Sequence, residues 1–192
     1  MERGAIRFQF SMIIVDDEPD NFDVIETLLS EQDYQLHYAA RGQKAIASLD
    51  IFEPDLILLD VMMPGIDGIE ICRQIKAMSK WQAVPIIMVT ALSSKSDLAN
   101  CLTAGADDFI SKPVNAIELR ARVHSMLRIK HQYDDLQSLL KLREDMVKMV
   151  VHDLRNPLAG ILLGLELIKR IDYPIEKQQT QLARLDYCTQ AI

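Results

Sequence analysis

The sequence has few of the residues and stretches that mark several large classes of protein. Its 192 residues include only three cysteines, Cys72, Cys101 and Cys188, and none has the C-x-x-C spacing of a zinc or redox site. An odd number of scattered cysteines is typical of a reducing compartment. The longest nearly unbroken apolar stretch, 158–165, has eight residues, whereas a membrane-spanning helix needs roughly 20. We therefore expect a cytoplasmic protein without a membrane segment.

Positive charge is also scarce. Lys and Arg number 21 against 28 Asp and Glu, which gives a net charge of −7. No general basic surface is then available to hold nucleic acid through its phosphates, and we expect no nucleic-acid partner. The sequence contains neither a G-x-G-x-x-G nor a G-x-x-x-x-G-K-[ST] loop, which disfavours nucleotide binding. With 49% apolar and 26% charged residues, the chain can still bury a globular core.

From Phe10 to about Arg128, short apolar runs alternate with amphipathic segments, which is the pattern of β-α units around a parallel sheet. Three of the apolar runs are continuous, so their strands should be central and buried on both faces: 12–15, 56–59 and 86–89. The run 34–40 alternates more and should lie at or near an edge. The predicted strands are Phe10–Asp16, Tyr34–Ala40, Asp55–Asp60, Val84–Thr90 and Asp107–Ser111, and the predicted helices between them are Asp20–Ser30, Gly42–Phe52, Gly68–Met78 and Ser94–Ala104.

Polar residues end these strands, where the functional crevice of an open parallel sheet lies. Three carboxylates, Asp16, Asp17 and Asp60, would repel one another there, which predicts a cation among them. Hard oxygen ligands beside a phosphoryl group favour Mg²⁺. Asp60 could then act as a nucleophile that forms an acyl phosphate, while Lys112 neutralises the transferred group and the Thr90 hydroxyl donates to it.

Each of these residues also has a simpler interpretation. The Asp16-Asp17 pair could cap the first helix, Thr90 could be an ordinary strand residue, and Phe109 could be plain core. A haloacid-dehalogenase-like phosphatase would need a second Asp two residues after the nucleophile, where this sequence has Met62.

Residues 10–128 resemble the receiver domain of two-component response regulators. The resemblance rests on Asp16-Asp17, on Asp60 within Leu58-Leu59-Asp60-Val61-Met62-Met63-Pro64, on Thr90-Ala91, and on Phe109 shortly before Lys112-Pro113. It implies an α/β fold with a five-stranded, doubly wound parallel sheet of the flavodoxin-like order 2-1-3-4-5.

The resemblance also implies roles for individual residues. Asp60 is the phosphoacceptor, and Mg²⁺ is held by Asp17, Asp60 and the Met62 backbone carbonyl, with Asp16 helping through water. Lys112 contacts the phosphoryl group, and the peptide bond before Pro113 is cis. A switch couples the Thr90 hydroxyl with the Phe109 ring. The implied partner is a cognate histidine kinase or phosphotransfer protein.

The second part of the chain is rich in helix-forming residues. Between Pro113 and Ile171 it has one proline and two glycines, which predicts helix nearly throughout. Two sets of positions at heptad spacing, which we call the seam, are apolar in eight of nine cases and predict a parallel coiled-coil homodimer. The alternative is a single amphipathic helix folded back on its own domain. The seam consists of Met126, Tyr133, Leu140, Val147 and Leu154 with Ile129, Leu136, Arg143 and Val150.

His152 falls outside the seam positions and should face solvent. The string 152–158, His-Asp-Leu-Arg-Asn-Pro-Leu, resembles the H-box of the dimerisation and phosphotransfer domain of sensor histidine kinases. That resemblance implies that His152 accepts a phosphoryl group, that Asp153 acts as acid or base, and that Asn156 positions water. Pro157 inside a helix costs about 3 kcal/mol and kinks it, which suits this motif better than a plain coiled coil. We expect a partial helical hairpin in a dimeric coiled coil or four-helix bundle.

These observations predict a receiver at 10–128, a coiled-coil linker helix at 129–146 and an incomplete dimerisation and phosphoacceptor segment at 147–192. We expect the chain as written to lack an ATP-binding domain, and so to be unable to bind ATP or autophosphorylate. It would be either a fragment of a hybrid sensor histidine kinase, with a kinase domain beyond Ile192 as a further partner, or a short natural protein. The leading hypothesis is that phosphorylation of Asp60 controls the helix that carries His152. The alternative is a phosphorylation-controlled interaction module in which His152 is not used.

Overall fold

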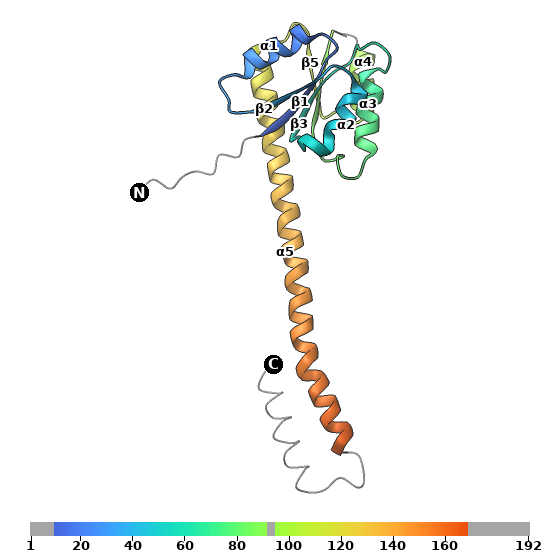
Figure 1. The fold of residues 1–192 in the computed structure, drawn as a ribbon, viewed down its shortest axis with the longest axis vertical. Helices are drawn as coiled ribbons and strands as arrows, with labels where there is room; N and C mark the ends of the chain where they lie inside the picture. The colour runs from blue at the N-terminus through green and yellow to red at the C-terminus, as the bar shows by residue number, and fades with distance from the viewer. Residues whose placement is uncertain (1–9, 92–94, 169–192) are drawn as a thin grey trace, which may run out of the picture. The chain divides into compact units, whose positions relative to one another are not determined.

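The computed structural model describes residues 10–91 and 95–168 (Figure 1). Its contacts divide the chain into two units, with the boundary between Tyr133 and Asp134. The first unit contains a five-stranded parallel sheet in the order β2-β1-β3-β4-β5, as predicted. The strands are β1 (Ser11–Val15), β2 (Gln35–Ala39), β3 (Leu56–Asp60), β4 (Ile86–Thr90) and β5 (Asp108–Ser111).

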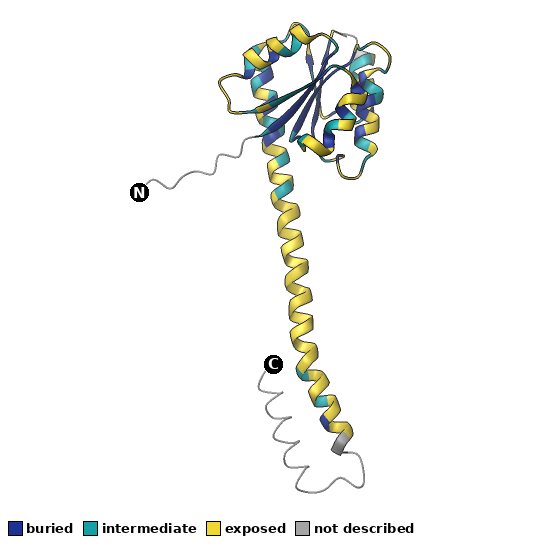
Figure 2. Cartoon of the chain, in the orientation of Figure 1, coloured by how far each residue is buried: buried dark blue, intermediate teal, exposed yellow. Residues whose placement is uncertain are grey.

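The continuous apolar runs form the middle of this sheet. Every residue of β1, β3 and β4 is buried, whereas β2 at the edge is mostly half-buried or exposed (Figure 2). Parallel strands buried on both faces need such runs, and the prediction of their central position is confirmed. The strand registers pair Val15 with Leu59, Asp60 with Val89, and Thr90 with Ser111. The polar residues after these strands therefore meet at one edge of the sheet.

Helices cover both faces of the sheet. α2 (Gly42–Phe52), α3 (Gly68–Ala77) and α4 (Lys95–Thr103) contribute residues to a core cluster on one face, together with Ile13, Ile57 and Met88. The opposite cluster joins Ile14 and Leu58 to α1 (Pro19–Leu29) and to the first turns of α5 (Ala116–Ile168). The sheet is thus doubly wound, and each strand sends alternate side chains to the two cores.

Helix α5 runs from Ala116 to Ile168 without a break and passes through Pro157. Asn115 caps it, since its Oδ1 accepts hydrogen bonds from the amides of Ile117 (2.9 Å) and Glu118 (3.1 Å). Its residues Leu119, Val123 and Leu127 are buried against the sheet. The second helix of the predicted hairpin falls outside the described residues. Within the ranges that the structure covers, no helix combines the length and the apolar character needed to span a membrane.

Candidate functional site

Three carboxylates converge at the carboxyl edge of the sheet. Asp16 and Asp17 follow β1, Asp60 ends β3, and one ligand oxygen from each lies within 4.8 Å of the others. Asp16 and Asp60 are only 2% and 4% exposed. Such a buried group of like charges requires a counter-charge, because the ionised forms lose their hydration and repel one another.

Asp16 has a second role at the start of α1. Its Oδ1 accepts hydrogen bonds from the Glu18 amide (3.0 Å) and from the Asn21 side-chain amide (2.9 Å). The N-cap residue itself is Glu18, which makes no side-chain cap hydrogen bond. The simpler interpretation of Asp16 as a helix-start residue is therefore correct in part, and it coexists with membership of the acidic cluster.

Lys112 supplies the positive charge that the cluster requires. Its Nζ lies 3.0 Å from Asp60 Oδ1 and 3.1 Å from Asp16 Oδ2, so one ammonium bridges two carboxylates. The Lys112 amide donates a 2.8 Å hydrogen bond to the Thr90 carbonyl, and the Lys112–Pro113 peptide bond is cis, as predicted. Lys112, which follows β5, therefore contacts carboxylates at the ends of two adjacent strands, β1 and β3.

Burial and pairing act in opposite directions on Asp60. Desolvation raises the pKa of this carboxyl above its ordinary value, whereas the hydrogen bond and charge of Lys112 and a hydrogen bond from the Met62 amide lower it less strongly. Desolvation lowers the pKa of Lys112, but the hydrogen bonds and charges of Asp60 and Asp16 outweigh it and leave that pKa raised. Lys112 is therefore cationic at neutral pH, while ionised Asp60 is held at a cost.

The donor set suits a hard divalent cation. Carboxylate oxygens from Asp16, Asp17 and Asp60 are close enough to share one ion, and this ligand class matches Mg²⁺. A cavity of about 570 Å³ opens beside them and leaves room for a phosphoryl group. It is lined by Asp17, Val61, Met62, Met63, Pro64, Asp67, Ile69, Asp97 and Asn100.

Gly68 lies against the backbone of Asp60 and Val61 and is not among the predicted site residues. A Cβ at this position would lie 2.0 Å from the Asp60 carbonyl oxygen and 2.9 Å from the Val61 Cα. The Gly68 amide also donates to the Val61 carbonyl at 3.1 Å. Only glycine therefore allows α3 to begin this close to the end of β3.

The two predicted switch residues lie on adjacent strands. Thr90 is fully buried at the end of β4, and Phe109 in β5 is half-buried against the core that also contains α2 and α3. The Arg122 guanidinium carbon of α5 lies 5.7 Å from the Phe109 ring centroid. Arg122 also pairs with Asp108 at 2.5 Å and with Glu118 at 2.8 Å. A residue of α5 thus lies over the ring at a cation–π distance.

The predicted phosphoacceptor histidine belongs to the second unit. The side chains of His152 and Asp153 are 70% and 71% exposed, and His152 Nδ1 lies 3.2 Å from Asp153 Oδ1. Asn156, one turn further along α5, is also exposed. The expectation that His152 faces solvent agrees with this placement, and the neighbouring carboxylate can fix the imidazole tautomer.

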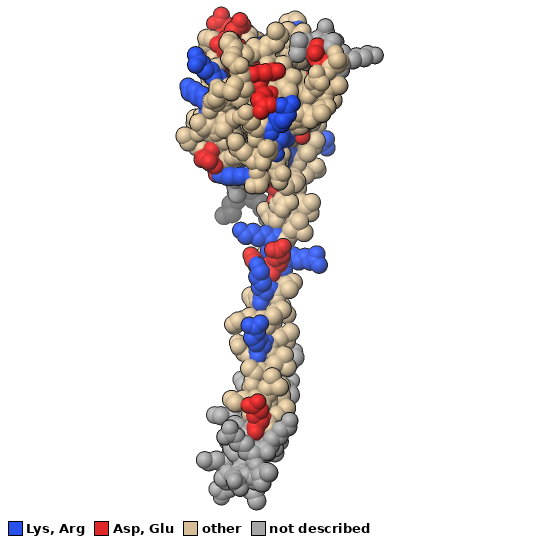
Figure 3. Space-filling model, turned by 90° about the vertical axis from the view of Figure 1, so that its right-hand side faces the viewer, with Lys and Arg blue, Asp and Glu red and all other residues tan. Residues whose placement is uncertain are grey.

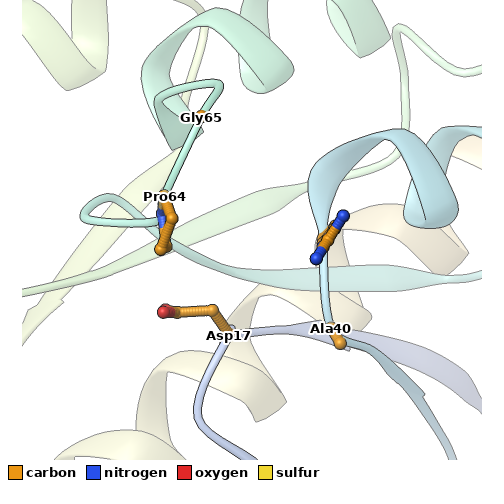
Figure 4. A pocket seen from close by; sticks show the side chains of 5 residues that line it. Asp17, Ala40, Pro64 and Gly65 are labelled. Carbon is orange, nitrogen blue, oxygen red and sulfur yellow. The ribbon is translucent and has the colours of Figure 1, made fainter.

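A second cavity, of about 490 Å³, borders the acidic cluster at Asp17. It is lined by Asp17, Ala40, Arg41, Pro64 and Gly65, and in Figure 4 the Asp17 side chain extends below Pro64. Asp17 therefore lines both cavities. On the face that Figure 3 presents, acidic and basic side chains lie next to one another, without a broad basic patch.

Known proteins resemble both parts of the chain. The family model of the response regulator receiver domain matches residues 12–124, and that of the His Kinase A (phospho-acceptor) domain matches residues 142–192. Response regulator PleD of Caulobacter vibrioides is 38% identical over 126 residues, which are 66% of this chain and 28% of that protein. The chain thus spans less than a third of that relative.

Solved structures show the same fold for the first unit. The signal receiver domain of a signal transduction histidine kinase from Syntrophus aciditrophicus is 35% identical, with a TM-score of 0.58 over 62% of this chain and 90% of that one. The receiver domain of a sensor histidine kinase from Pseudomonas aeruginosa, which holds a magnesium ion in its active site cleft, is 34% identical. Its TM-score is 0.57 over 62% of this chain and 98% of that one.

Proposed function

Because this chain belongs to the response regulator receiver domain family and continues into a histidine kinase phosphoacceptor domain, it is a protein of two-component signal transduction, and we propose that Asp60 is its phosphoacceptor. The single observation that carries this proposal is the convergence of Asp16, Asp17 and Asp60 with Lys112 at the carboxyl edge of the sheet. The proposal includes a Mg²⁺-dependent reaction and a histidine kinase or phosphotransfer protein as the phosphoryl donor. It also includes the cytoplasmic location that the scattered cysteines indicate.

The side chains divide the work of phosphoryl transfer among them. An oxygen of the Asp60 carboxylate attacks phosphorus and forms an acyl phosphate, while the bond from phosphorus to the donor atom breaks and the donor leaves with the electron pair. The Lys112 ammonium, already 3.0 Å from Asp60, neutralises charge on the transferred group, and the buried Thr90 hydroxyl donates to one of its oxygens. Asp16, Asp17, Asp60 and the Met62 carbonyl would hold Mg²⁺, which when bound neutralises carboxylate and phosphoryl oxygens.

Phosphate uptake from a small donor tests the receiver half of this proposal. Wild-type protein incubated with acetyl phosphate and Mg²⁺ should gain one phosphoryl group by intact mass, and Asp60→Asn should gain none. Asp50→Asn is the matched control, because Asp50 is an exposed carboxylate of α2 that pairs with Lys80. Equal uptake by wild type and Asp60→Asn would show that the assignment is wrong.

His152 is the proposed phosphoacceptor of the second unit. Its exposure and the contact with Asp153 support this role, with Asp153 handling a proton and Asn156 positioning water. A separate histidine kinase ATP-binding domain supplied with ATP should label wild-type protein and fail to label His152→Gln. His124→Gln changes an exposed histidine of the same helix and should be labelled normally. Label that is absent, or independent of His152, would favour the interaction module instead.

The seam supports a homodimer. Seven of its eight apolar residues are exposed, by 39% to 56%: Ile129, Tyr133, Leu136, Leu140, Val147, Val150 and Leu154. Apolar side chains at heptad spacing are stabilised when a second helix covers them. His Kinase A domains form dimers, and we propose that a second copy of α5 packs here in parallel.

A further inference from the structure

One basic residue, Arg41, lines the cavity of about 490 Å³ beside the acidic cluster. Its walls come from the segment after β2, which supplies Ala40 and Arg41, and from the segment after β3, which supplies Pro64 and Gly65. Asp17 lies between these two walls. The Asp16 amide donates to the Ala39 carbonyl at 3.3 Å, so the first wall runs directly alongside the residues that follow β1.

The local structure does not account for an arginine at position 41. Arg41 is the N-cap residue of α2 and makes no side-chain cap hydrogen bond. Ser, Thr, Asp and Asn are preferred there, and a positive charge at a helix N-terminus opposes the helix dipole. Among residues 10–91 and 95–168, the exposed Arg41 guanidinium forms no hydrogen bond or ion pair.

The negative charge of the neighbouring acidic cluster indicates a function for Arg41. Three carboxylates face one ammonium there, and a phosphoryl donor brings further negative charge to the same edge. A guanidinium in the cavity that Asp17 also lines offers an approaching anion an attractive contact outside the carboxylate cluster. Its planar fork can donate two parallel N–H bonds to two oxygens of one phosphate in a fixed geometry, whereas an ammonium acts as a point charge.

We propose that Arg41 binds the phosphoryl donor, an acyl phosphate or a phosphorylated imidazole, through its anionic oxygens during transfer to Asp60. The inference rests on the proposed function of Asp60. With acetyl phosphate, an Asp60 oxygen forms a bond to phosphorus while the bond from phosphorus to the acetyl oxygen breaks. Acetate leaves with the electron pair, and no proton is required. Arg41 is a donor-binding residue and contacts only the oxygens that do not react.

The rate constant of Asp60 phosphorylation in the full chain, measured in single-turnover experiments over a range of acetyl phosphate concentrations in saturating Mg²⁺, tests this role; its half-saturating concentration is the KM and its limiting value the kcat. Arg41→Gln should raise the KM for acetyl phosphate about tenfold, the effect of losing one charge-assisted contact, and leave kcat within about twofold. Arg41→Lys should recover part of this change because it keeps the charge. Lys44→Gln removes one positive charge from the exposed surface of the same helix and should stay within about twofold of wild type.

Calorimetric titration with Mg²⁺ separates donor binding from a structural role. Removal of a nearby cation should leave Mg²⁺ affinity unchanged or slightly higher in Arg41→Gln, because repulsion between the two cations falls. Weaker Mg²⁺ binding in parallel with a higher KM would overturn the inference, since it would show that Arg41 only shapes the site. Equal KM values for Arg41→Gln and Lys44→Gln would overturn it too. If wild type takes up no phosphate, the assignment of Asp60 fails first and Arg41 loses its role with it.

Discussion

At the scale of single residues, the ionised carboxylate that the site requires at Asp60 lowers the free energy of unfolding. Burial raises its pKa, so the ionised carboxylate is less favourable in the folded chain than in the unfolded chain. A raised folded-state pKa means that stability is lost as pH rises from the ordinary value of 3.8 through the folded value. Asn at this position cannot ionise, and Lys112 keeps Asp16 as a partner.

We expect Asp60→Asn to raise the free energy of unfolding at pH 7 by about 1 kcal/mol in Mg²⁺-free buffer. The gain should shrink as the pH falls below 3.8, where wild-type Asp60 becomes protonated in the unfolded state as well as in the folded state. Urea unfolding of wild type and Asp60→Asn, at pH 7 and at a pH below 3.8, measures this difference in the free energy of unfolding. A variant less stable than wild type at pH 7 would contradict the argument, because Lys112 would then stabilise Asp60 more than burial penalises it.

Cys72 should be chemically silent in the folded protein. It is fully buried in α3, and desolvation raises the pKa of its thiol to about 11. At pH 8 the thiolate fraction is then about 100-fold lower than for an ordinary cysteine, before any effect of shielding. Iodoacetamide labelling followed by peptide mass spectrometry should show Cys72 at least about 100-fold slower in native than in urea-unfolded protein. Similar rates in both states would mean that this face of the core opens readily.

A substitution at Gly68 tests whether the position of the Asp60 backbone determines the rate of phosphorylation. Gly68→Ala should lower the rate of Asp60 phosphorylation at least tenfold, because the new Cβ displaces the Asp60 carbonyl and with it the carboxylate. Gly42→Ala is the control, since its Cβ would meet the Ile71 side chain, 2.3 Å away, instead of the backbone of β3. Both variants should be less stable by thermal unfolding. Only Gly68→Ala should be slow when rates are compared per folded molecule.

At the scale of elements, α5 is tied to the sheet at the strand that carries Phe109. Arg122 binds both oxygens of Asp108, at 2.5 and 2.6 Å, and its guanidinium also faces the Phe109 ring. Movement of the ring therefore changes a contact of the helix that continues into the seam. This contact is a physical route for the proposed switch.

A double-mutant cycle measures the interaction energy between Arg122 and Asp108. Arg122→Gln and Asp108→Asn should each lower the free energy of unfolding, and the double variant should lose less than the sum, with a coupling energy of about 1 kcal/mol. The pair is partly exposed, so the coupling should weaken in 1 M NaCl. Additive losses would show that Glu118 or the ring, and not Asp108, holds Arg122.

The central strands of the fold were predictable because each one is a continuous run of apolar residues in the sequence. Continuous apolar runs identified β1, β3 and β4, and their observed bounds differ from the predicted ones by one or two residues at an end. The acidic cluster followed from parallel strands that end at the same edge. Arg41, Gly68 and Arg122 were not predictable in this way. Their roles depend on distances between loops and across helices that no local pattern specifies, such as the approach of Gly68 to the Asp60 carbonyl.

At the scale of the whole molecule, the seam determines the expected association state. Leu140→Glu places a charge at a seam position and should shift the protein from dimer to monomer in sedimentation equilibrium, with a dissociation constant at least 100-fold higher. Leu142→Glu is the matched control, because Leu142 is also exposed but lies two residues off the seam position. Dissociation by both variants alike would mean that another face of α5 forms the contact.

The exposed seam also has a consequence for heat denaturation. Residues buried within the first unit have their partners in the same chain, so mass action does not affect their unfolding. Within residues 10–91 and 95–168 no other element covers the apolar seam of the second half of α5, and in the proposed dimer the partner helix covers it, so its melting should depend on protein concentration. A tenfold dilution should cost the associated helix about 1.4 kcal/mol per dimer. Calorimetry should therefore resolve two transitions, of which only the helical one moves to lower temperature on dilution.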